Sequence, residues 1–227
     1  MCERFTLIAE NEEIIHHYGL NPTKFPSNYT KTYNASPSQK VLGILGDDDQ
    51  SCRAGYIQWG IPKPKTSQNQ RVDITFNMKS ENIETVKESI QRRRIIIPVD
   101  SYYQWGKNKT NFQPSRVLLK TGKIFSLAGL FEIWDTPEGK TSGCVILTTQ
   151  ANPALYGIHP RMPVIIPSMA ENIWLDRSNQ NINELQSMLK PFPALEMENH
   201  LVSSLVNNIE YNSSILIRKE EPEPNLF

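Results

Sequence analysis

The chain has 227 residues, 38% of them hydrophobic, which is enough for a real core and fits one large domain or two small ones. Its formal net charge is zero, which excludes a global field that would draw it to nucleic acid, so any polyanion site must be a local patch. A polar N-terminus and short apolar runs argue against a signal peptide or a membrane span, so we expect a soluble, cytoplasmic protein.

The first half of the chain is predicted to combine short strands with two helices. One helix is expected over residues 10–18, closed by Gly19, because glycine adopts the left-handed conformation that ends helices. A second helix is expected to begin near Asn82, with an apolar face formed by residues 83, 86 and 90 and a basic end at residues 92–94. Strands are predicted at residues 4–8, 41–45, 54–59 and 73–77.

The second half is predicted to consist mainly of strands separated by turn residues. Residues 168–171 have the pattern of a capping box, which would start a short helix that reaches Leu175. Another short helix is expected over residues 183–189, stopped by Pro191. Strands are predicted at residues 95–99, 102–105, 116–119, 124–128, 130–134 and 144–149.

The irregular order of these elements indicates the fold class. Regular βαβ alternation is absent from the predicted elements, which disfavours a doubly wound sheet. We predict an α+β fold, with a strongly curved, largely antiparallel, barrel-like sheet and peripheral short helices. We expect a single domain over residues 1–218, followed at residues 219–227 by a disordered acidic tail that contains prolines.

The cysteines and histidines do not form a metal or disulfide pattern. Cys2, Cys52 and Cys144 are an odd number without CxxC spacing, which favours a reducing compartment. The four histidines are scattered, and none of their spacings resembles a zinc site. We therefore expect no metal and no cofactor. The sequence contains no signal for an oligomer, so we expect a monomer.

Cys2 directly follows the initiator methionine. Removal of Met1 would place a free α-amine and a thiol on the same residue, a 1,2-aminothiol. Its amine condenses with an aldehyde to an imine, and its thiol then closes a thiazolidine ring. The ordinary pKa values, about 7.7–8.0 for the amine and about 8.5 for the thiol, leave both reactive forms partly present at neutral pH. The alternative is an accidental cysteine at a loose terminus.

Two segments combine polar residues suited to chemistry. His159 and Arg161 lie in a turn stiffened by Pro160 and Pro163, which suits a proton shuttle. The alternative is a surface turn with an ordinary salt bridge. The segment at residues 76–81 contains an asparagine, Asn77, suited to orienting a terminal amine, and a lysine, Lys79, suited to a phosphate. The alternative is a strand-to-helix connection with a capping residue.

Two further segments suit nucleic acid. Arginines 92–94 lead into an aromatic run at residues 102–105, as in a groove for single strands where phosphates meet charge and bases stack on rings. The alternative is a solvated helix end followed by an aromatic core, which is the commoner outcome. A proline–lysine loop at residues 59–65 suits phosphates as well, or is a simple exposed turn.

In their order along residues 1 to about 217, these motifs resemble the SRAP family, the SOS-response-associated peptidase proteins that sense abasic sites in single-stranded DNA. The motifs are Met-Cys-x-Arg-Phe at 1–5, Tyr-Asn-x-x-Pro at 33–37, Trp-Gly at 59–60, Phe-Asn-x-x-Ser-Glu at 76–81, Arg-x-Ile-Ile-Pro-x-Asp-x-Tyr-x-Trp at 94–105 (allowing one further residue), Leu-Thr-Thr-x-Ala-Asn at 147–152, His-x-Arg-Met-Pro at 159–163 and Val-Ser-Ser-Leu-Val-Asn at 202–207.

The resemblance implies a role for individual residues. Cys2 would form a thiazolidine with the ring-opened aldehyde of an abasic site, giving a covalent DNA–protein crosslink. Asn77 would position the terminal amine and the sugar, and His159 would shuttle protons. Basic contacts to DNA phosphates would come from Arg4, Lys79 and Arg161. Side chains expected to line or wedge the DNA groove are Trp59 and Met162.

Two departures from the family pattern affect the expected chemistry. Glu3 replaces the usual glycine and places a carboxylate beside Cys2. Gln104 stands where the family has a catalytic glutamate, and an amide hydrogen-bonds but transfers no proton. One lost general acid costs about 10²–10⁴-fold in the step that it serves. We therefore expect slower crosslinking and crosslinks that resist reversal, unless Asp100 or Glu81 substitutes.

Two other functions stay open on these residues. One is a binding module for single-stranded DNA that has lost efficient chemistry, which Gln104 and Glu3 favour. The other is a cysteine peptidase, acting on itself through Cys2 and His159, although no oxyanion hole is identifiable. In a bacterium the resemblance implies a cytoplasmic protein at the nucleoid.

Overall fold

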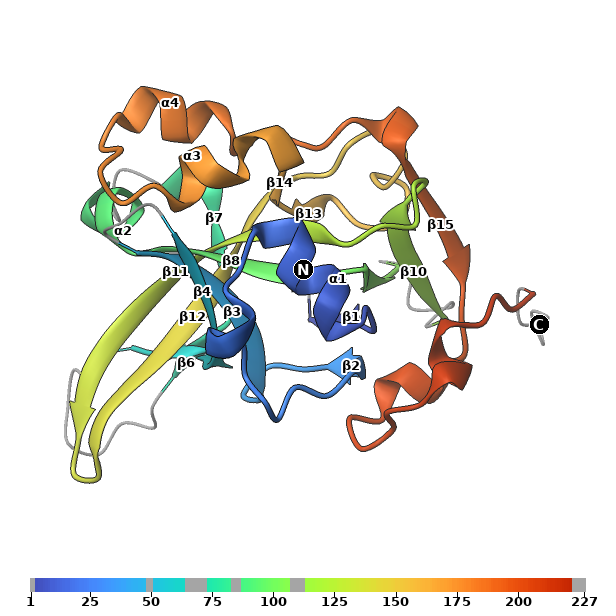
Figure 1. Ribbon diagram of the computed structural model, residues 1–227. Coiled ribbons are helices and arrows are strands. Elements are labelled where there is room, and N and C mark those ends of the chain that lie inside the picture. The colour runs from blue at the N-terminus through green and yellow to red at the C-terminus, as the bar shows by residue number, and fades with distance from the viewer. Residues whose placement is uncertain (1–2, 48–50, 64–72, 83–86, 107–112, 222–227) are drawn as a thin grey trace.

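The computed structural model describes residues 3–47, 51–63, 73–82, 87–106 and 113–221 (Figure 1). Two larger sheets and a two-stranded ribbon form its frame, and most strand pairs are antiparallel. The parallel pairs join β12 (Gly139–Gln150) to β4 (Cys52–Trp59) and to β7 (Asn77–Lys79). The predicted α+β class with a largely antiparallel sheet is confirmed.

The five-stranded sheet has the order β15 (Met197–Leu201), β10 (Pro114–Leu119), β9 (Ser101–Trp105), β1 (Arg4–Leu7) and β2 (Thr32–Ala35). The eight-stranded sheet has the order β13 (Arg161–Pro163), β12, β4, β3 (Lys40–Gly46), β8 (Arg94–Val99), β11 (Phe125–Thr136) and β14 (Ile165–Ile166), with β7 added beside β12. The ribbon pairs β5 (Ile61–Pro62) with β6 (Ile74–Thr75).

The helices are short and lie outside the sheets (Figure 1). The α-helices are α1 (Asn11–Tyr18), α2 (Lys87–Arg92), α3 (Glu171–Leu175) and α4 (Ile182–Ser187). The 3-10 turns are η1 (Pro22–Lys24), η3 (Ser168–Ala170), η4 (Ala194–Glu196), η5 (Ser204–Asn207) and η6 (Ser214–Ile217). No helix in the described ranges is long and apolar enough to cross a membrane.

The alternation of side chains along β8 shows how the layers are arranged. Successive side chains of a strand point to opposite faces of its sheet. Ile96 packs in one core with Ile14 of α1 and Trp174 of α3, on the helix side. Ile95 and its neighbour at 97 pack in a second core with Phe5 of β1, on the side of the five-stranded sheet. The eight-stranded sheet therefore separates a helix layer from the five-stranded sheet.

The C-terminal segment covers the outer face of the five-stranded sheet. Tyr103 of β9 packs there with Val206 and Leu216 in a third, smaller core. The Asn34 amide donates to the carbonyl oxygens of Val206 and Asn208, at 3.2 Å and 3.0 Å, and to that of residue 211 at 3.0 Å. The Tyr-Asn-x-x-Pro motif thus anchors the chain end to β2.

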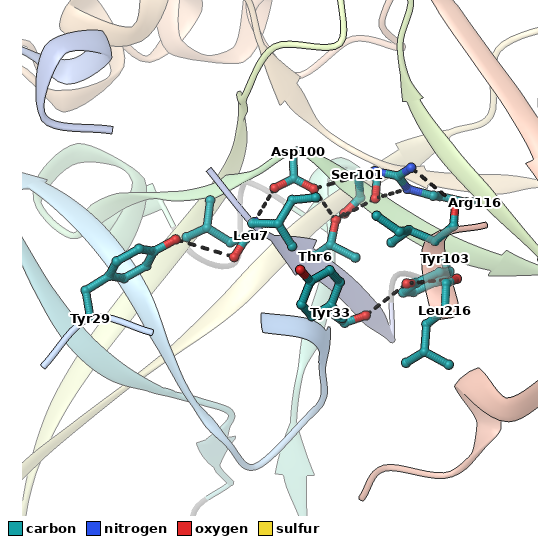
Figure 2. Close-up of polar contacts among 11 residues, drawn as sticks. Thr6, Leu7, Tyr29, Tyr33, Asp100, Ser101, Tyr103, Arg116 and Leu216 are labelled. Carbon is teal, nitrogen blue, oxygen red and sulfur yellow. Dashed lines mark hydrogen bonds and ion pairs between the residues drawn. The ribbon is translucent and has the colours of Figure 1, made fainter. Parts of the chain in front are cut away.

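A buried polar network holds β1, the strand that begins beside the N-terminus (Figure 2). The Asp100 carboxylate accepts hydrogen bonds from the Thr6 hydroxyl and from the backbone N–H of Ile8. The Ser101 hydroxyl lies 2.6 Å from the Thr6 hydroxyl and accepts from Arg116 Nε at 2.8 Å. Because β1 also pairs with β9 and β2, its position is fixed on both edges and by side chains.

Some predicted elements differ from the structure. The capping box at residues 168–171 does not form, because the N-cap of α3 makes no side-chain bond. Glu171 is instead buried and bonded to His17 and Ser126. The two strands predicted at 124–128 and 130–134 are one strand, β11, because it runs on into a long hairpin with β12. Of the second helix, residues 83–86 lie outside the described residues.

The described part of the segment predicted as a tail is bonded to the five-stranded sheet. Glu220 donates its backbone N–H to Leu201 O at 2.9 Å, and Gln113 Nε2 donates to the carbonyl of Glu221 at 3.2 Å. Residues 219–221 are therefore attached to β15 and to the start of β10. The rest of the predicted tail, residues 222–227, lies outside the described residues.

Candidate active site

The backbone of Arg161 brings two of the predicted site residues together. Gln104, at the end of β9, donates from Nε2 to Arg161 O at 3.2 Å. The same oxygen lies 3.0 Å from Nδ1 of His159. Gln104 is only 1% exposed, and its Oε1 has no hydrogen-bond partner among the described residues. The two sheets therefore meet here through polar groups, where their apolar core ends.

The imidazole of His159 is held at one nitrogen. Nδ1 lies 3.0 Å from both the backbone N and the backbone O of Arg161. A neutral ring with its proton on Nε2 accepts from Arg161 N–H, and a protonated ring donates to Arg161 C=O. Nδ1 is therefore engaged with the Arg161 backbone in both protonation states. The backbone N–H of His159 also bonds to Leu155 O at 3.0 Å, which fixes the turn.

The side chain of Arg161 pairs with a carboxylate. Nη1 and Nη2 donate to the two carboxylate oxygens of Glu81, at 2.5 Å and 2.9 Å. Nη2 also bonds to Thr148 Oγ1 at 3.2 Å and to the Thr148 carbonyl. The hydrogen bonds from Arg161 hold the pKa of Glu81 below its ordinary value. The predicted alternative of a salt bridge therefore holds for Arg161 in the unbound protein.

Asn77 and Lys79 lie on β7, next to the part of β12 that contacts Arg161. β7 runs parallel to β12, with Asn77 opposite Ile146 and Lys79 opposite Thr148. Thr148 is the residue that contacts Arg161, so this pairing places the 76–81 motif beside the 159–163 motif. Lys79 is exposed, and Asn77 is partly buried.

A hollow of 480 Å³ opens between the start of the chain and β7. Glu3, Lys63 and Asn77 are among its lining residues. The antiparallel register of β1 and β9 pairs Arg4 with Tyr103, and its continuation sets Glu3 opposite Gln104. Cys2, the predicted nucleophile, lies outside the described residues and directly precedes Glu3 in the sequence.

Three predicted DNA contacts lie apart from this group. Arg4 is paired with Tyr103, so its side chain is on the opposite face of the sheet from Gln104. Burial lowers the pKa of Arg4. Trp59 and Met162 are 0% exposed in the unbound protein, and their contact with DNA stays a prediction. Trp59 Nε1 donates to the carbonyl of Phe76 at 2.9 Å and supports the approach to β7.

The basic and aromatic run at residues 92–105 is structural. Arg94 is 5% exposed and donates to backbone carbonyls at the end of α2, within α3 and beyond α3. Arg93 pairs with Glu132. The tyrosines at 102 and 103 are fully buried in two cores. The hypothesis of a single-strand groove along this run is therefore wrong, and the alternative of an aromatic core holds.

Sequence reasoning did not place Glu81, Thr148 and Asp100. Glu81 belongs to the site through Arg161, whereas Asp100 lies in the network that holds β1. Thr148 contacts Arg161 from the middle of the Leu-Thr-Thr motif. The order of the motifs indicated that these segments matter, but Glu81 and Arg161 are 80 positions apart, and no local pattern pairs them.

The two described cysteines are not activated as nucleophiles. Burial raises the pKa of the Cys144 thiol to about 12, and burial raises that of Cys52 as well. A thiolate, not a thiol, is the nucleophilic form of cysteine. Within the described ranges, no group of three or more His, Cys, Asp or Glu side chains is arranged to hold a metal ion.

Comparison with known proteins gives consistent results. Abasic site processing protein YoqW of Bacillus subtilis is 38% identical over 226 residues, covering 96% of this chain and 99% of the relative. Abasic site processing protein YoaM of Bacillus subtilis is 37% identical, covering 97% and 99%. Abasic site processing protein YedK of Escherichia coli is 26% identical over 197 residues, covering 82% of this chain and 83% of the relative.

Solved structures support the fold. A crystal structure of a protein from Bacteroides thetaiotaomicron superposes with a TM-score of 0.83 at 23% identity, over 97% of this chain and 100% of that chain. A second, from Bordetella bronchiseptica, superposes with a TM-score of 0.72 at 20% identity, over 89% of this chain and 100% of that chain. The family model described as SOS response associated peptidase (SRAP) matches residues 1–209. The chain therefore belongs to the SRAP family.

Proposed function

We propose that this protein processes abasic sites in single-stranded DNA and that it captures them covalently through Cys2, after removal of Met1. The relatives named as abasic site processing proteins support the substrate class. The chemistry of an N-terminal cysteine supports thiazolidine formation as the reaction, because an abasic sugar opens to an aldehyde and a 1,2-aminothiol condenses with aldehydes.

The observation that carries this proposal is the junction at the Arg161 backbone. Gln104 and His159 meet there, and an unused buried acceptor, Gln104 Oε1, lies beside them. A buried polar atom without a partner is costly in a folded protein, and such atoms are expected where a ligand completes the site. The register of β1 and β9, continued by one residue, sets Glu3 opposite Gln104, and Glu3 directly follows Cys2 in the sequence, which supports this choice of site.

The reaction balances with groups that the chain supplies. The amine of Cys2 adds to the C1′ aldehyde, and loss of one water gives the imine. The thiol then adds to the imine carbon and its proton passes to the nitrogen, which closes the thiazolidine. In this proposal His159 Nε2 moves protons during both additions. Asn77, at the rim of the hollow, orients the amine and the sugar by hydrogen bonds.

In this proposal, Gln104 determines how fast the crosslink forms and how readily it reverses. As an amide it donates to Arg161 O and offers Oε1 as an acceptor, but it delivers no proton to the opening sugar. Ring opening then depends on the small open-chain fraction of the abasic sugar. We expect crosslinking to be slower, and reversal slower still, than with a glutamate at this position.

Contacts to the DNA backbone come from basic residues near the hollow. Lys79 is exposed on β7, and Lys63 lines the hollow with Glu3. Single-stranded DNA suits this arrangement, because its sugar is reachable without opening a duplex. The roles of Arg4 and Arg161 as direct phosphate contacts belong to the same proposal.

The test is an incubation of purified protein with single-stranded DNA that carries one abasic site, followed by a denaturing gel. Intact mass first confirms that Met1 is absent. The native protein is expected to give a heat-stable shifted band, and Cys2→Ala is expected to give none. Gln104→Glu is expected to form and release the band faster, by about 10²-fold. No band from the native protein and none from Gln104→Glu would refute the proposal.

A second candidate function is favoured by Gln104 itself. If the amide has removed the chemistry altogether, the protein is a non-covalent module for single-stranded DNA. The same gel separates the two candidates. A band that appears only with Gln104→Glu, together with DNA binding by the native protein, would favour the module.

A further inference from the structure

The ion pair between Arg161 and Glu81 lies at the site but is not explained by the chemistry of crosslinking. Glu81 presents both carboxylate oxygens to Nη1 and Nη2, at 2.5 Å and 2.9 Å. Two parallel N–H···O bonds are also the geometry in which arginine binds phosphate. The carboxylate therefore occupies the donor positions that a phosphate needs.

The two partners are not held equally. Arg161 has a side chain only 15% exposed, and Thr148 anchors it through a hydroxyl and a carbonyl oxygen. Glu81 is 47% exposed, and its hydrogen bonds to other described side chains are those to Arg161. If the pair opens, Arg161 stays in place because of Thr148, and Glu81 is free to turn toward solvent. The carboxylate is the replaceable partner.

Charge also favours replacement at the time of binding. Lys79 stands two residues before Glu81 and contributes with Arg161 to lowering the pKa of Glu81, so the carboxylate stays charged. A phosphate that approaches Lys79 and Arg161 comes close to the Glu81 carboxylate, and the two negative charges repel each other. The local balance of two cations and one anion then becomes two cations facing the DNA.

We propose that Glu81 acts as an internal substitute for a DNA phosphate, which occupies Arg161 in the free protein and is displaced when a strand binds. This inference rests on the proposed function for the identity of the ligand and adds a specificity-determining residue to it. Glu81 raises the free-energy cost of placing a phosphate at Arg161, and so restricts tight binding to strands whose other contacts with the site offset that cost.

The test measures non-covalent binding, so that it does not depend on the crosslink. The Cys2→Ala protein is titrated with an undamaged single-stranded oligonucleotide at several salt concentrations. Adding Glu81→Gln is expected to tighten binding about fivefold, because no charged pair must be broken. The slope of log K against log salt is expected to become steeper by roughly 0.7, the value for one more phosphate on a single strand, because no released carboxylate takes up a cation.

The matched control is Glu138→Gln, which makes the same change of charge at an exposed residue in the turn between β11 and β12. It is expected to leave the salt slope unchanged. A second comparison places Glu81→Gln in an Arg161→Gln background, where its effect on binding should vanish because the group that it occupies is gone. If circular dichroism shows that Arg161→Gln does not fold, the salt slopes of Glu81→Gln and Glu138→Gln alone test the role of Glu81.

The outcomes separate the two proposals. DNA binding by Cys2→Ala with equal affinity and equal slope for Glu81→Gln would overturn the substitute role of Glu81 and leave the proposed function intact. An equal change from Glu138→Gln would overturn it too, because the effect would then be one of net charge. Absence of DNA binding by all these proteins would overturn the proposed function, and this inference with it.

Discussion

At the scale of single residues, the turn that holds His159 supports its proposed role in proton transfer. Its Nδ1 is engaged by the backbone of Arg161 in both protonation states, which fixes the orientation of the ring. His159→Asn keeps an acceptor for the Arg161 N–H, because Oδ1 takes the position of Nδ1, but it transfers no proton. We expect this variant to crosslink about 10²-fold more slowly with an unchanged melting temperature. A crosslinking rate equal to that of the native protein, measured on the same gel, would remove His159 from the mechanism.

The three cysteines should differ in reactivity. Burial raises the pKa of the Cys144 thiol to about 12, and that of Cys52 is raised from 9.0. A raised thiol pKa means that less thiolate is present at neutral pH than for an ordinary cysteine, and that the thiolate forms only as the pH approaches the raised pKa. We expect a thiol-alkylating reagent near pH about 7 to label Cys2 first, Cys52 slowly and Cys144 only on unfolding. Peptide mass mapping against time measures this order, and early labelling of Cys144 would contradict the structure.

At the scale of elements, the proposed chemistry depends on β1, because Cys2 lies two positions before the first residue of this strand. Its anchor is the network of Asp100, Thr6, Ser101 and Arg116 (Figure 2). Thr6→Val keeps the shape and removes the buried hydroxyl, which leaves acceptors unpaired. We expect a loss of about 1–3 kcal/mol in the free energy of unfolding, measured with denaturant. We also expect slower crosslinking, since a looser β1 positions Cys2 less well. A loss of stability alone, with an unchanged rate, would show that the network only supports the fold.

The same network predicts a dependence of stability on pH. Burial raises the pKa of Asp100 above its ordinary value of 3.8, despite hydrogen bonds to the carboxylate that lower it. The folded protein therefore binds this proton more tightly than the unfolded chain does. The resulting stability is complete below 3.8 and is lost as the pH rises through the raised pKa. We expect the native protein to lose stability relative to Asp100→Asn over that window. A constant difference between the two, in denaturant midpoints across the same pH values, would contradict the raised pKa.

A glycine sets the closest approach between two elements. A Cβ added to Gly143 would lie 2.2 Å from the carbonyl oxygen of Gly60, where β12 passes the end of β4. Both groups belong to the backbone, so neither moves aside without disturbing the parallel pairing. We expect Gly143→Ala to cost about 1–3 kcal/mol in the free energy of unfolding. Gly55→Ala, with no atom within 4 Å of the added Cβ, is the control.

The strands and the helix end at Gly19 were predictable because their sequence patterns are local. The start of α3 and the pairing of residues far apart in the sequence were not, because they depend on tertiary contacts. The apolar run of β8 is buried on both faces and contains only β-branched residues and a proline between Arg94 and Val99. Gly19 has a φ of 60°, as its predicted role as helix terminator requires. The capping box at residues 168–171 failed because Glu171 is drawn to His17 and Ser126, a tertiary interaction that no local pattern contains.

At the scale of the whole molecule, the site is a junction between sheets rather than a feature of one segment. Asn77, Gln104 and His159 come from three segments, and the order of the family motifs identified them while their spacing did not place them. The burial of Trp59 and Met162 could not be predicted, because an aromatic or a methionine suits both a core and a DNA groove. The pairing of Arg161 with Glu81 depends on the parallel contact of β7 with β12, which sequence periodicity does not encode.

The central claim is that the N-terminal cysteine forms the covalent bond. The most direct measurement digests the crosslinked complex with protease and nuclease and maps the modified peptide by tandem mass spectrometry. We expect one adduct, on a peptide that begins at Cys2 without Met1, and an increase in the peptide's mass equal to the mass of the ring-opened abasic nucleotide less one water. An adduct on Lys63, Lys79 or any other side chain, or an intact Met1 on the crosslinked peptide, would contradict it.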